Sequence, residues 1–278
     1  MRILPVTHLQ EQVTQLLIQA AYQLPQDYLD ALAQAQRQEA SPLGQTIIQL
    51  LQENATFAQQ EQVPTCQDTG MAILYLDVGQ EVHFTGGELG QALEAAVRDA
   101  YAALRKSVVR DPLQRENTGD NTPPIVHFRL VPGDRVRVRA LMKGFGGEMM
   151  SRLAMLTPAD GREGIRRFVL ETVERAGPNA CPPVIVGVGL GSSFDGVAAL
   201  AKEALLRPLG QPNPAPHLAQ LEAELLEAVN GLGIGPQGLG GTVTALAVHV
   251  ESAPTHIAAL PVAVNLNCSA PRRAETVL

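Results

Sequence analysis

Several residue types are scarce in this 278-residue chain, and each shortage narrows the class of protein it can be. There is no Trp, and there are only four Tyr and six Phe, so few side chains are available to stack on nucleobases or sugars. Charged residues make up only 18%, which argues against a disordered or coiled-coil chain. The net charge is −7 and no basic stripe is visible, so nucleic acid is not an expected partner.

Long apolar runs are also missing. No stretch of about 18 uninterrupted apolar residues occurs, so we expect no membrane-spanning segment. Residues 1–6 lack the apolar core of a secretion signal, and we therefore expect a cytoplasmic protein whose cysteines stay reduced. Apolar residues still make up 45% of the chain, enough to form a substantial core in one large domain or two modest ones.

The apolar pattern predicts a mixed α/β (α+β) fold with a helical start. Three-and-four spacing indicates helices over residues 7–39, and Ser41-Pro42 is typical of the start of a third. We expect a helical N-terminal region at 1–60 and an α/β domain at 61–278, or one continuous domain. Further helices are expected near 88–107, 157–176, 198–206 and 218–230, and strands near 71–78, 125–131, 135–140, 183–190, 242–250 and 261–266. The strands 125–131 and 135–140 flank a Pro-Gly-Asp turn and are expected to form a hairpin.

The three cysteines, Cys66, Cys181 and Cys268, are an odd number and cannot all pair in disulfides. Each stands at the edge of a predicted element, where ligand-binding residues usually lie. Three thiolates can hold three corners of an iron–sulfur cube and leave the fourth iron open to a substrate. Two other interpretations stay open, namely inert buried thiols and a zinc site completed by His256 or His249.

Polar residues near Cys66 are candidates for chemistry. Asp68 lies two residues after this cysteine, and an Asp beside a metal ligand can exchange a proton with a metal-bound oxygen, although Asp68 and Thr69 are also typical of a plain turn closed by Gly70. Downstream, Arg105, Lys106 and Arg110 follow a predicted helix, and any of them is able to pair with a carboxylate.

Two glycine-rich segments resemble ligand-binding loops. Gly187, Gly189 and Gly191 follow a predicted strand, but the last glycine of a dinucleotide fingerprint is replaced by Ser192, so we interpret them as a tight strand-to-helix turn. The segment 143–147 lacks the Gly-Lys-Ser/Thr order of a phosphate-binding loop, and a close approach of its backbone to a ligand is the functional alternative to a simple turn.

A series of short motifs resembles the iron–sulfur-dependent class I fumarases and the related L-tartrate dehydratases. The resemblance runs from about Gln62 to Ser269 and depends on the motifs together, because none of them alone is specific. In chain order they are Cys66-Gln67-Asp68-Thr69-Gly70, Asn117-Thr118-Gly119-Asp120-Asn121, Lys143-Gly144-x-Gly146, Ala180-Cys181-Pro182-Pro183 and Cys268.

This resemblance implies a [4Fe–4S] cluster held by Cys66, Cys181 and Cys268, whose fourth iron acts as a Lewis acid on a C4-dicarboxylate. It implies hydro-lyase activity, the reversible hydration of fumarate to (S)-malate, with conversion of L-tartrate to oxaloacetate as the alternative. The residues that it places at the substrate are Gln67, Asp68, Arg105, Gly146 and His256, with Asp68 as the catalytic one.

The resemblance also implies a partner. Single-chain members of the family are about twice as long, and their second domain supplies further carboxylate-binding residues and the catalytic base. Our chain ends ten residues after Cys268. We therefore expect an α subunit that works with a separate β subunit, in an α2β2 heterotetramer, and that is nearly inactive alone. The contrasting hypothesis is a non-catalytic partner subunit whose cysteines are inert or bind structural zinc.

Overall fold

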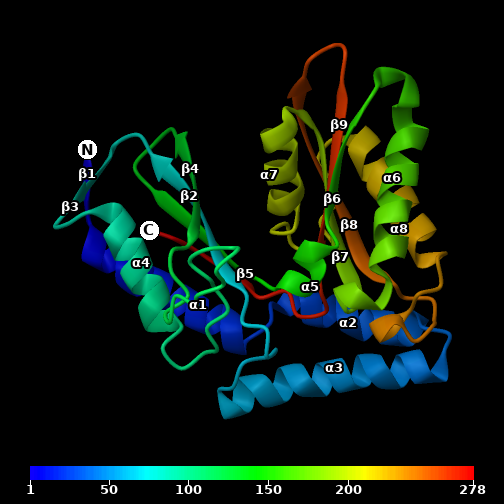
Figure 1. The fold of residues 1–278 in the computed structure, drawn as a ribbon, viewed down its shortest axis with the longest axis horizontal. Helices are drawn as coiled ribbons and strands as arrows, with labels where there is room; N and C mark the ends of the chain where they lie inside the picture. The colour runs from blue at the N-terminus through cyan, green and yellow to red at the C-terminus, as the bar shows by residue number, and fades with distance from the viewer. The chain divides into compact units, whose positions relative to one another are not determined.

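The computed structural model describes all 278 residues and confirms the mixed α/β class. Two compact units are assembled from interleaved parts of the chain (Figure 1). The first unit comprises Met1–Pro25, Ala55–Gly144 and Pro271–Leu278, and the second comprises Gln26–Asn54 and Phe145–Ala270. None of the helices combines the length and the apolar character needed to cross a membrane.

A separate helical region was expected for residues 1–60, but the N-terminal helices are divided between the two compact units. Helix α1 (Val6–Tyr22) belongs to the first unit, α2 (Gln26–Gln38) belongs to the second, and α3 (Pro42–Glu61) runs from the second into the first. An apolar stripe shows that a helix buries one face, but it carries no information about which sheet covers that face.

The first unit contains a four-stranded sheet in the order β10-β5-β2-β4. Helices α1 and α4 (Leu89–Ala100) pack on one face, where alternate side chains of the central strands join theirs in one apolar core. A separate parallel pair is formed by β1 and β3. The strands of this unit are β1 (Arg2–Pro5), β2 (Met71–Gly79), β3 (Val82–Thr85), β4 (Ile125–Val131), β5 (Val136–Lys143) and β10 (Arg273–Val277).

The predicted hairpin between residues 125–131 and 135–140 is wrong. Strand β2 lies between β4 and β5, pairing parallel with β4 and antiparallel with β5. The Pro-Gly-Asp turn is present in the sequence, but β2 is buried over most of its length and needs a strand on both sides. Local turn signals do not reveal such an insertion.

Helix α4 is shorter than the predicted helix at 88–107. It ends at Ala100, and the Lys106 side chain folds back so that its Nζ donates to the carbonyls of Tyr101, Ala102 and Leu104 at 2.5–2.9 Å. Lys106 thus satisfies carbonyls that the end of the helix leaves without partners.

The second unit is a three-layer arrangement around a sheet in the order β6-β9-β7-β8 (Figure 1). Helix α7 covers one face, and α6 and α8 cover the other. Its strands are β6 (Arg152–Leu156), β7 (Val184–Ser192), β8 (Ala245–Thr255) and β9 (Leu260–Asn267). Its helices besides α2 are α5 (Phe145–Met149), α6 (Gly161–Ala176), α7 (Phe194–Ala204) and α8 (Pro216–Asn230), with short 3-10 turns η1 (Pro158–Asp160), η2 (Gly177–Ala180) and η3 (Pro236–Gly238).

Packing of α7 explains the glycines of β7. A Cβ on Gly187 would lie 2.1 Å from the carbonyl oxygen of Ala201, and one on Gly189 would lie 2.2 Å from that of Val197. The glycines therefore let α7 approach the sheet closely. The close packing of α7 explains the Gly-x-Gly spacing, and a nucleotide-binding role is not needed to account for it.

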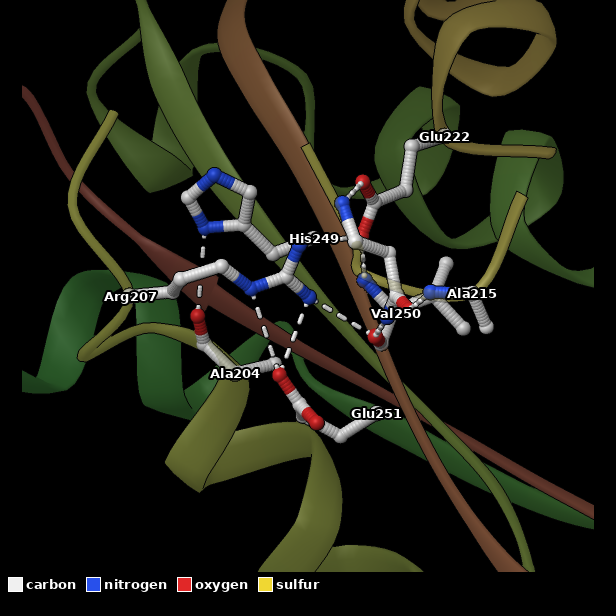
Figure 2. A network of polar contacts seen from close by, with 8 residues as sticks. Ala204, Arg207, Ala215, Glu222, His249, Val250 and Glu251 are labelled. Carbon is white, nitrogen blue, oxygen red and sulfur yellow. Dashed lines mark hydrogen bonds and ion pairs between the residues drawn. The ribbon is translucent and has the colours of Figure 1, made fainter. Parts of the chain in front are cut away.

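Strand β8 is an edge strand whose outer backbone groups are covered by side chains (Figure 2). The Val250 N–H donates to Glu222 at 2.7 Å, and its carbonyl accepts from Arg207 and from Asn213, each at 2.7 Å. Arg207 also pairs with Glu222 at 2.7 Å and with Glu251 at 2.9 Å. The unpaired groups of a sheet edge invite another strand, and this network blocks that pairing.

Candidate active site

Cys181 sits in a tight connection of the second unit. Helix α6 ends at Ala176, the turn η2 follows, and Cys181 adopts a left-handed backbone (φ 53°) just before the start of β7. Its N–H donates to the carbonyl of Pro178 at 2.9 Å, and the residue is exposed. The buried strand β7 thus begins three residues after an accessible thiol.

The Cys268 loop lies beside the Cys181 loop. Strands β7 and β9 are antiparallel neighbours with Ile185 opposite Asn267, so the start of one strand and the end of the other share an edge of the sheet. The Ser269 N–H donates to the carbonyl of Cys181 at 3.0 Å and joins the two loops directly. The second unit therefore brings together two of the three predicted sulfur ligands.

Gly146 lies close to the same loops. The sequence predicts a loop or turn at 143–147, but Gly146 lies in the first turn of the short helix α5, where a Cβ would lie 3.0 Å from the carbonyl oxygen of Asn179. Helix α5 is held against β9 because the Ser151 hydroxyl donates to Gly147 and accepts from the N–H of Leu266. The close approach expected for Gly146 is thus to the segment that carries Cys181.

The Cys66 loop belongs to the first unit and is fixed at its far end. Gly70 has φ 70°, and a Cβ there would lie 2.5 Å from the carbonyl oxygen of Lys143. Tyr101 donates its hydroxyl to the carbonyls of Thr69 and Gly70 at 3.1 and 3.3 Å, and burial raises the pKa of this phenol, which keeps it a donor. Asn121 donates its amide to the carbonyl of Gly70 at 3.0 Å.

The side chains that follow Cys66 lie close to it in space. The amide oxygen of Gln67 is 3.8 Å from Cys66 Sγ. Asp68 uses one carboxylate oxygen to accept the Gly70 N–H at 3.0 Å, as expected of an Asx-type turn. Its other oxygen lies 3.1 Å from the position of a Cβ on Gly144. Asp68 thus closes the turn with one carboxylate oxygen, while its other oxygen lies near Gly144.

Sequence analysis missed a buried cation near Asp68. The side chain of Arg272 is only 1% exposed, and its Nη2 also lies 3.1 Å from the Cβ position of Gly144. Its Nε is buried without a hydrogen-bond partner. The signal available in the sequence was an Arg pair four residues after Cys268, which has no distinctive spacing.

Arg105 is connected to the Cys66 loop through its backbone. Its carbonyl accepts from the Thr69 hydroxyl at 2.7 Å, and its side chain is exposed. The polar segment 117–122 supports this stretch, because the buried Asn121 accepts the N–H groups of Ser107 and Val108 at 2.5 and 3.1 Å. This segment, one of the motifs that carry the family resemblance, therefore has an observed structural role.

His256 lies at the other end of the sheet from the two cysteines of its unit. It follows β8 in the turn before β9, and Thr255 pairs with Ser192 at the far end of β7. A nine-residue strand spans roughly 30 Å at about 3.3 Å per residue, so His256 and Cys181 are separated by about that distance. His256 is one of the residues that line a cavity of about 550 Å³, together with His217 and Arg162.

None of the three cysteines forms a disulfide, which fits a role as metal ligands better than a structural crosslink. Their distribution is Cys66 in the first unit and the pair Cys181 and Cys268 in the second. No group of three His, Cys, Asp or Glu side chains gathers in the geometry of a metal site. The donor set, three thiols at loop positions with two of the loops joined, fits an iron–sulfur cluster more closely than a zinc site with a histidine.

Comparison with known proteins identifies the class of enzyme. A model of the fumarate hydratase (Fumerase) family matches residues 10–277, and the chain belongs to this family. It is therefore a hydro-lyase, an enzyme that removes or adds water across a carbon–carbon bond.

Particular relatives cover nearly the whole chain. A protein of Methanocaldococcus jannaschii, provisionally named L(+)-tartrate dehydratase subunit alpha, is 42% identical over 94% of this chain and 94% of its own length. The L(+)-tartrate dehydratase subunit alpha of Escherichia coli K12 is 38% identical over 96% of this chain and 90% of its own length. The protein of the same name from Shigella boydii serotype 4 matches to the same extent.

Proposed function

We propose that this chain is the α subunit of an L-tartrate dehydratase. The observation that carries the proposal is the 38–42% identity, over 94–96% of the chain, to proteins named as that subunit. In the reaction, tartrate loses a hydroxyl from one carbon and a proton from the neighbouring carbon, and the resulting enol becomes oxaloacetate. Fumarate hydration, our first expectation from the sequence, is less well supported, because the similar relatives carry the tartrate name.

The cofactor of the proposed enzyme is a [4Fe–4S] cluster with Cys66, Cys181 and Cys268 as its protein ligands. The support is the absence of a disulfide at all three cysteines and the backbone hydrogen bond between the Cys181 and Cys268 loops. When bound, such a cluster supplies a Lewis acid that draws electron density from a substrate hydroxyl and carboxylate.

Four side chains or backbone positions complete the proposed substrate site. Asp68 holds or accepts the proton exchanged at the substrate hydroxyl, since one of its oxygens is directed away from the turn that it closes. Gln67 orients the substrate through its amide, and Arg105 pairs with a carboxylate through its exposed guanidinium. Gly146 allows the backbone of α5 to approach the substrate.

His256 keeps its proposed role as a substrate ligand only in a particular arrangement. Since roughly 30 Å of strand separates it from Cys181, it does not contact a substrate held at that thiol of its own chain. We therefore propose that His256 of one copy contacts substrate bound to another copy. An α2β2 assembly contains two such copies.

The proposed partner is a β subunit that provides the remaining carboxylate-binding residues and the catalytic base. The name subunit alpha of the relatives supports it. The chain expressed alone is then expected to bind iron but to turn over substrate at least 100-fold more slowly than the complex.

The substrate is tested by co-expression with the neighbouring gene for a β-like chain, followed by anaerobic assay on L-tartrate, D-tartrate, fumarate and (S)-malate. We expect kcat/KM for L-tartrate to exceed that for fumarate by at least about tenfold, the ratio that 1.4 kcal/mol of differential transition-state binding produces. A preference for fumarate and malate would overturn the proposal and restore fumarate hydration.

The contrasting hypothesis of a zinc-binding or inert partner subunit is tested on the purified complex. Iron, acid-labile sulfide and zinc are measured after anaerobic purification. About four irons and four sulfides per chain, with broad absorbance near 400 nm, are expected for the cluster. Colourless protein that contains zinc, or no metal after reconstitution, would contradict it.

A further inference from the structure

Two residues outside the Cys181 and Cys268 loops contact them: Gln237 contacts both loops, and Tyr28 contacts the Cys268 loop. The loops are linked directly by a hydrogen bond from Ser269 N–H to the carbonyl of Cys181. Both loops are exposed or half-buried at the cysteine itself. Segments with so few hydrogen bonds of their own need support to keep two sulfur atoms at a fixed separation.

Gln237, in the turn η3, contacts both loops. Its backbone N–H and its side-chain Nε2 both donate to the carbonyl of Pro182, at 2.8 and 2.7 Å, and Nε2 also donates to the hydroxyl of Ser269 at 3.2 Å. Pro182 directly follows Cys181, and Ser269 directly follows Cys268. One side chain therefore bridges the residues next to both thiols.

The backbone of Gln237 has an unfavourable conformation, which its surroundings must hold in place. Its φ of 52° and ψ of 19° are left-handed, which costs free energy for any residue with a Cβ. The next residue, Gly238, packs so tightly that a Cβ there would lie 2.4 Å from the Cβ of Pro178, in the turn before Cys181. The loop thus presses directly on the segment that carries the cysteine.

The rest of the Gln237 loop is anchored at its far end. Glu39, which is 1% exposed, accepts the N–H groups of Thr242 and Val243 at 2.8–3.0 Å, and Asn230 accepts that of Thr244 at 2.9 Å. These bonds fix the loop to α2 and α8, so Gln237 is held by a rigid support.

Tyr28, in helix α2, holds the Cys268 loop. Its side chain is fully buried in α2, and its hydroxyl donates to the carbonyl of Ser269 at 2.6 Å. Burial raises the pKa of the Tyr28 phenol. The phenol therefore stays protonated and remains a donor.

We propose that Gln237 and Tyr28 are positioning residues that hold the Cys181 and Cys268 thiols as a preformed pair before any cofactor binds. The assignment of this pair to a cluster rests on the proposed function, but the pairing of the thiols does not. Preformed ligands lower the ordering cost of binding, so loss of either residue weakens capture of any group that both sulfurs hold.

The test uses phenylarsine oxide, whose arsenic forms bonds to two thiol sulfurs while the two thiol protons leave with its oxygen as water. The full-length chain with Cys66→Ser retains only the proposed pair, and release of the arsenical by increasing 2-mercaptoethanol measures how well the pair chelates. We expect one tightly held arsenical per chain. Gln237→Gly removes the side chain but suits the left-handed backbone, and we expect release at about tenfold lower monothiol, because two hydrogen bonds are lost.

A matched control and a second variant make the test specific. Gln62 has the same φ of 52° and donates its Nε2 only to Gln59, so Gln62→Gly imitates the backbone change and should leave arsenical binding unchanged. Tyr28→Phe removes a single hydroxyl and should lower the release concentration severalfold, and circular dichroism confirms that each variant is folded.

The outcomes separate this inference from the proposed function. Equal arsenical retention in the parent, Gln237→Gly and Tyr28→Phe would overturn the positioning roles while leaving the thiol pair and the cluster in place. Failure of the Cys66→Ser parent to chelate the arsenical, in a protein whose wild type binds four irons, would also overturn the inference without affecting the function. Release at a lower monothiol concentration in both positioning variants but not in Gln62→Gly supports it.

Discussion

Asp68 and Arg272 owe their position to the absence of a side chain at Gly144. The carboxylate oxygen of Asp68 and Nη2 of Arg272 both lie 3.1 Å from where a Cβ would stand. Contacts of 3.0–3.4 Å are tighter than most Cβ atoms make, so one or both groups must move if a methyl is added. Arg272 has little room to do so, because it is 1% exposed.

Gly144→Ala should therefore lower activity more than stability. A displacement of Asp68 by several tenths of an ångström spoils the alignment of a proton-transfer group, and we expect kcat/KM of the αβ enzyme to fall about tenfold or more. The control is Gly90→Ala in α4, where the added methyl meets only the flexible side chain of Glu88. Activity that is unchanged in a folded Gly144→Ala enzyme would remove Asp68 from the proposed mechanism.

At the scale of single elements, the polar contacts of the segment after α7 protect the edge strand β8 from pairing with another strand. Glu222 is nearly buried, as is its partner Arg207, with side-chain exposures of 8% and 12%. Glu222 also accepts the N–H groups of Val250 and Asn213. Because so many donors converge on one carboxylate, its removal leaves a buried cation and two buried N–H groups without their acceptor (Figure 2).

Glu222→Gln should destabilise the protein by roughly 3–5 kcal/mol, the range seen when one partner of a buried ion pair is removed. Urea denaturation of the two proteins measures the difference. Glu224 lies on the same helix and pairs with Arg162 at 2.7 Å, but both are about half exposed, so Glu224→Gln should cost less than about 1 kcal/mol. Equal effects of the two substitutions would show that the network around Val250 contributes little.

The connection from α2 to the Gln237 loop depends on the charge of Glu39. Burial by itself would raise the pKa of Glu39, but the N–H groups of Ser41, Thr242 and Val243 outweigh it and hold that pKa below its usual value of 4.5. A carboxylate with a depressed pKa stabilises the fold fully above its unfolded pKa, and this contribution is lost as the pH falls through the folded pKa.

Glu39→Gln should accordingly lower the free energy of unfolding by roughly 1.5–3 kcal/mol at pH 7, the usual contribution of hydrogen bonds to a charged group. The difference from wild type should begin to shrink below about pH 4.5, because the unfolded wild-type carboxyl then takes up a proton before the folded one does, and it should be lost as the pH falls through the lowered folded pKa. Denaturation at pH 7 and pH 4 provides the measurement, with the exposed Glu174→Gln as a control that shows no such change. A pH-independent difference would mean that charge is not what Glu39 contributes.

At the scale of the whole molecule, the three cysteines are distributed over both compact units. Cys66 is carried by the first unit, and Cys181 and Cys268 by the second. Three sulfur ligands leave one iron of a cube without a protein ligand, which makes that iron accessible to oxygen as well as to substrate.

Aeration of the anaerobically prepared αβ enzyme should abolish most activity, and Fe²⁺ with thiol under argon should restore it. Each of Cys66→Ser, Cys181→Ser and Cys268→Ser should lower the iron content at least severalfold, because each removes a ligand. Ser193→Ala, on the surface at the start of α7, serves as a control. Undiminished activity after prolonged aeration would count against a cluster with an open iron.

Much of the fold was predictable because it depends on local periodicity. The helices α1, α2, α6 and α8 and the strands β2, β7 and β9 all lie where three-and-four or continuous apolar patterns indicated them. Pairing partners were not predictable in the same way. Insertion of β2 between β4 and β5, and the assignment of α1 and α2 to different units, depend on which apolar faces meet at long range.

The candidate site, like the fold, was predictable from the sequence only in part. The sequence by itself determined the three thiols, the Gln67-Asp68 pair, the glycines that bound the loops, and the family they indicate, because ligand chemistry is a property of residue type and order. Only the tertiary structure decided that the Cys181 and Cys268 loops are hydrogen-bonded neighbours, that Gln237 and Tyr28 donate to residues beside these cysteines, that Arg272 lies near Gly144, and that His256 lies at the distant end of its sheet. These are matters of strand pairing and of buried hydrogen bonds between residues up to 241 positions apart, which no local pattern records.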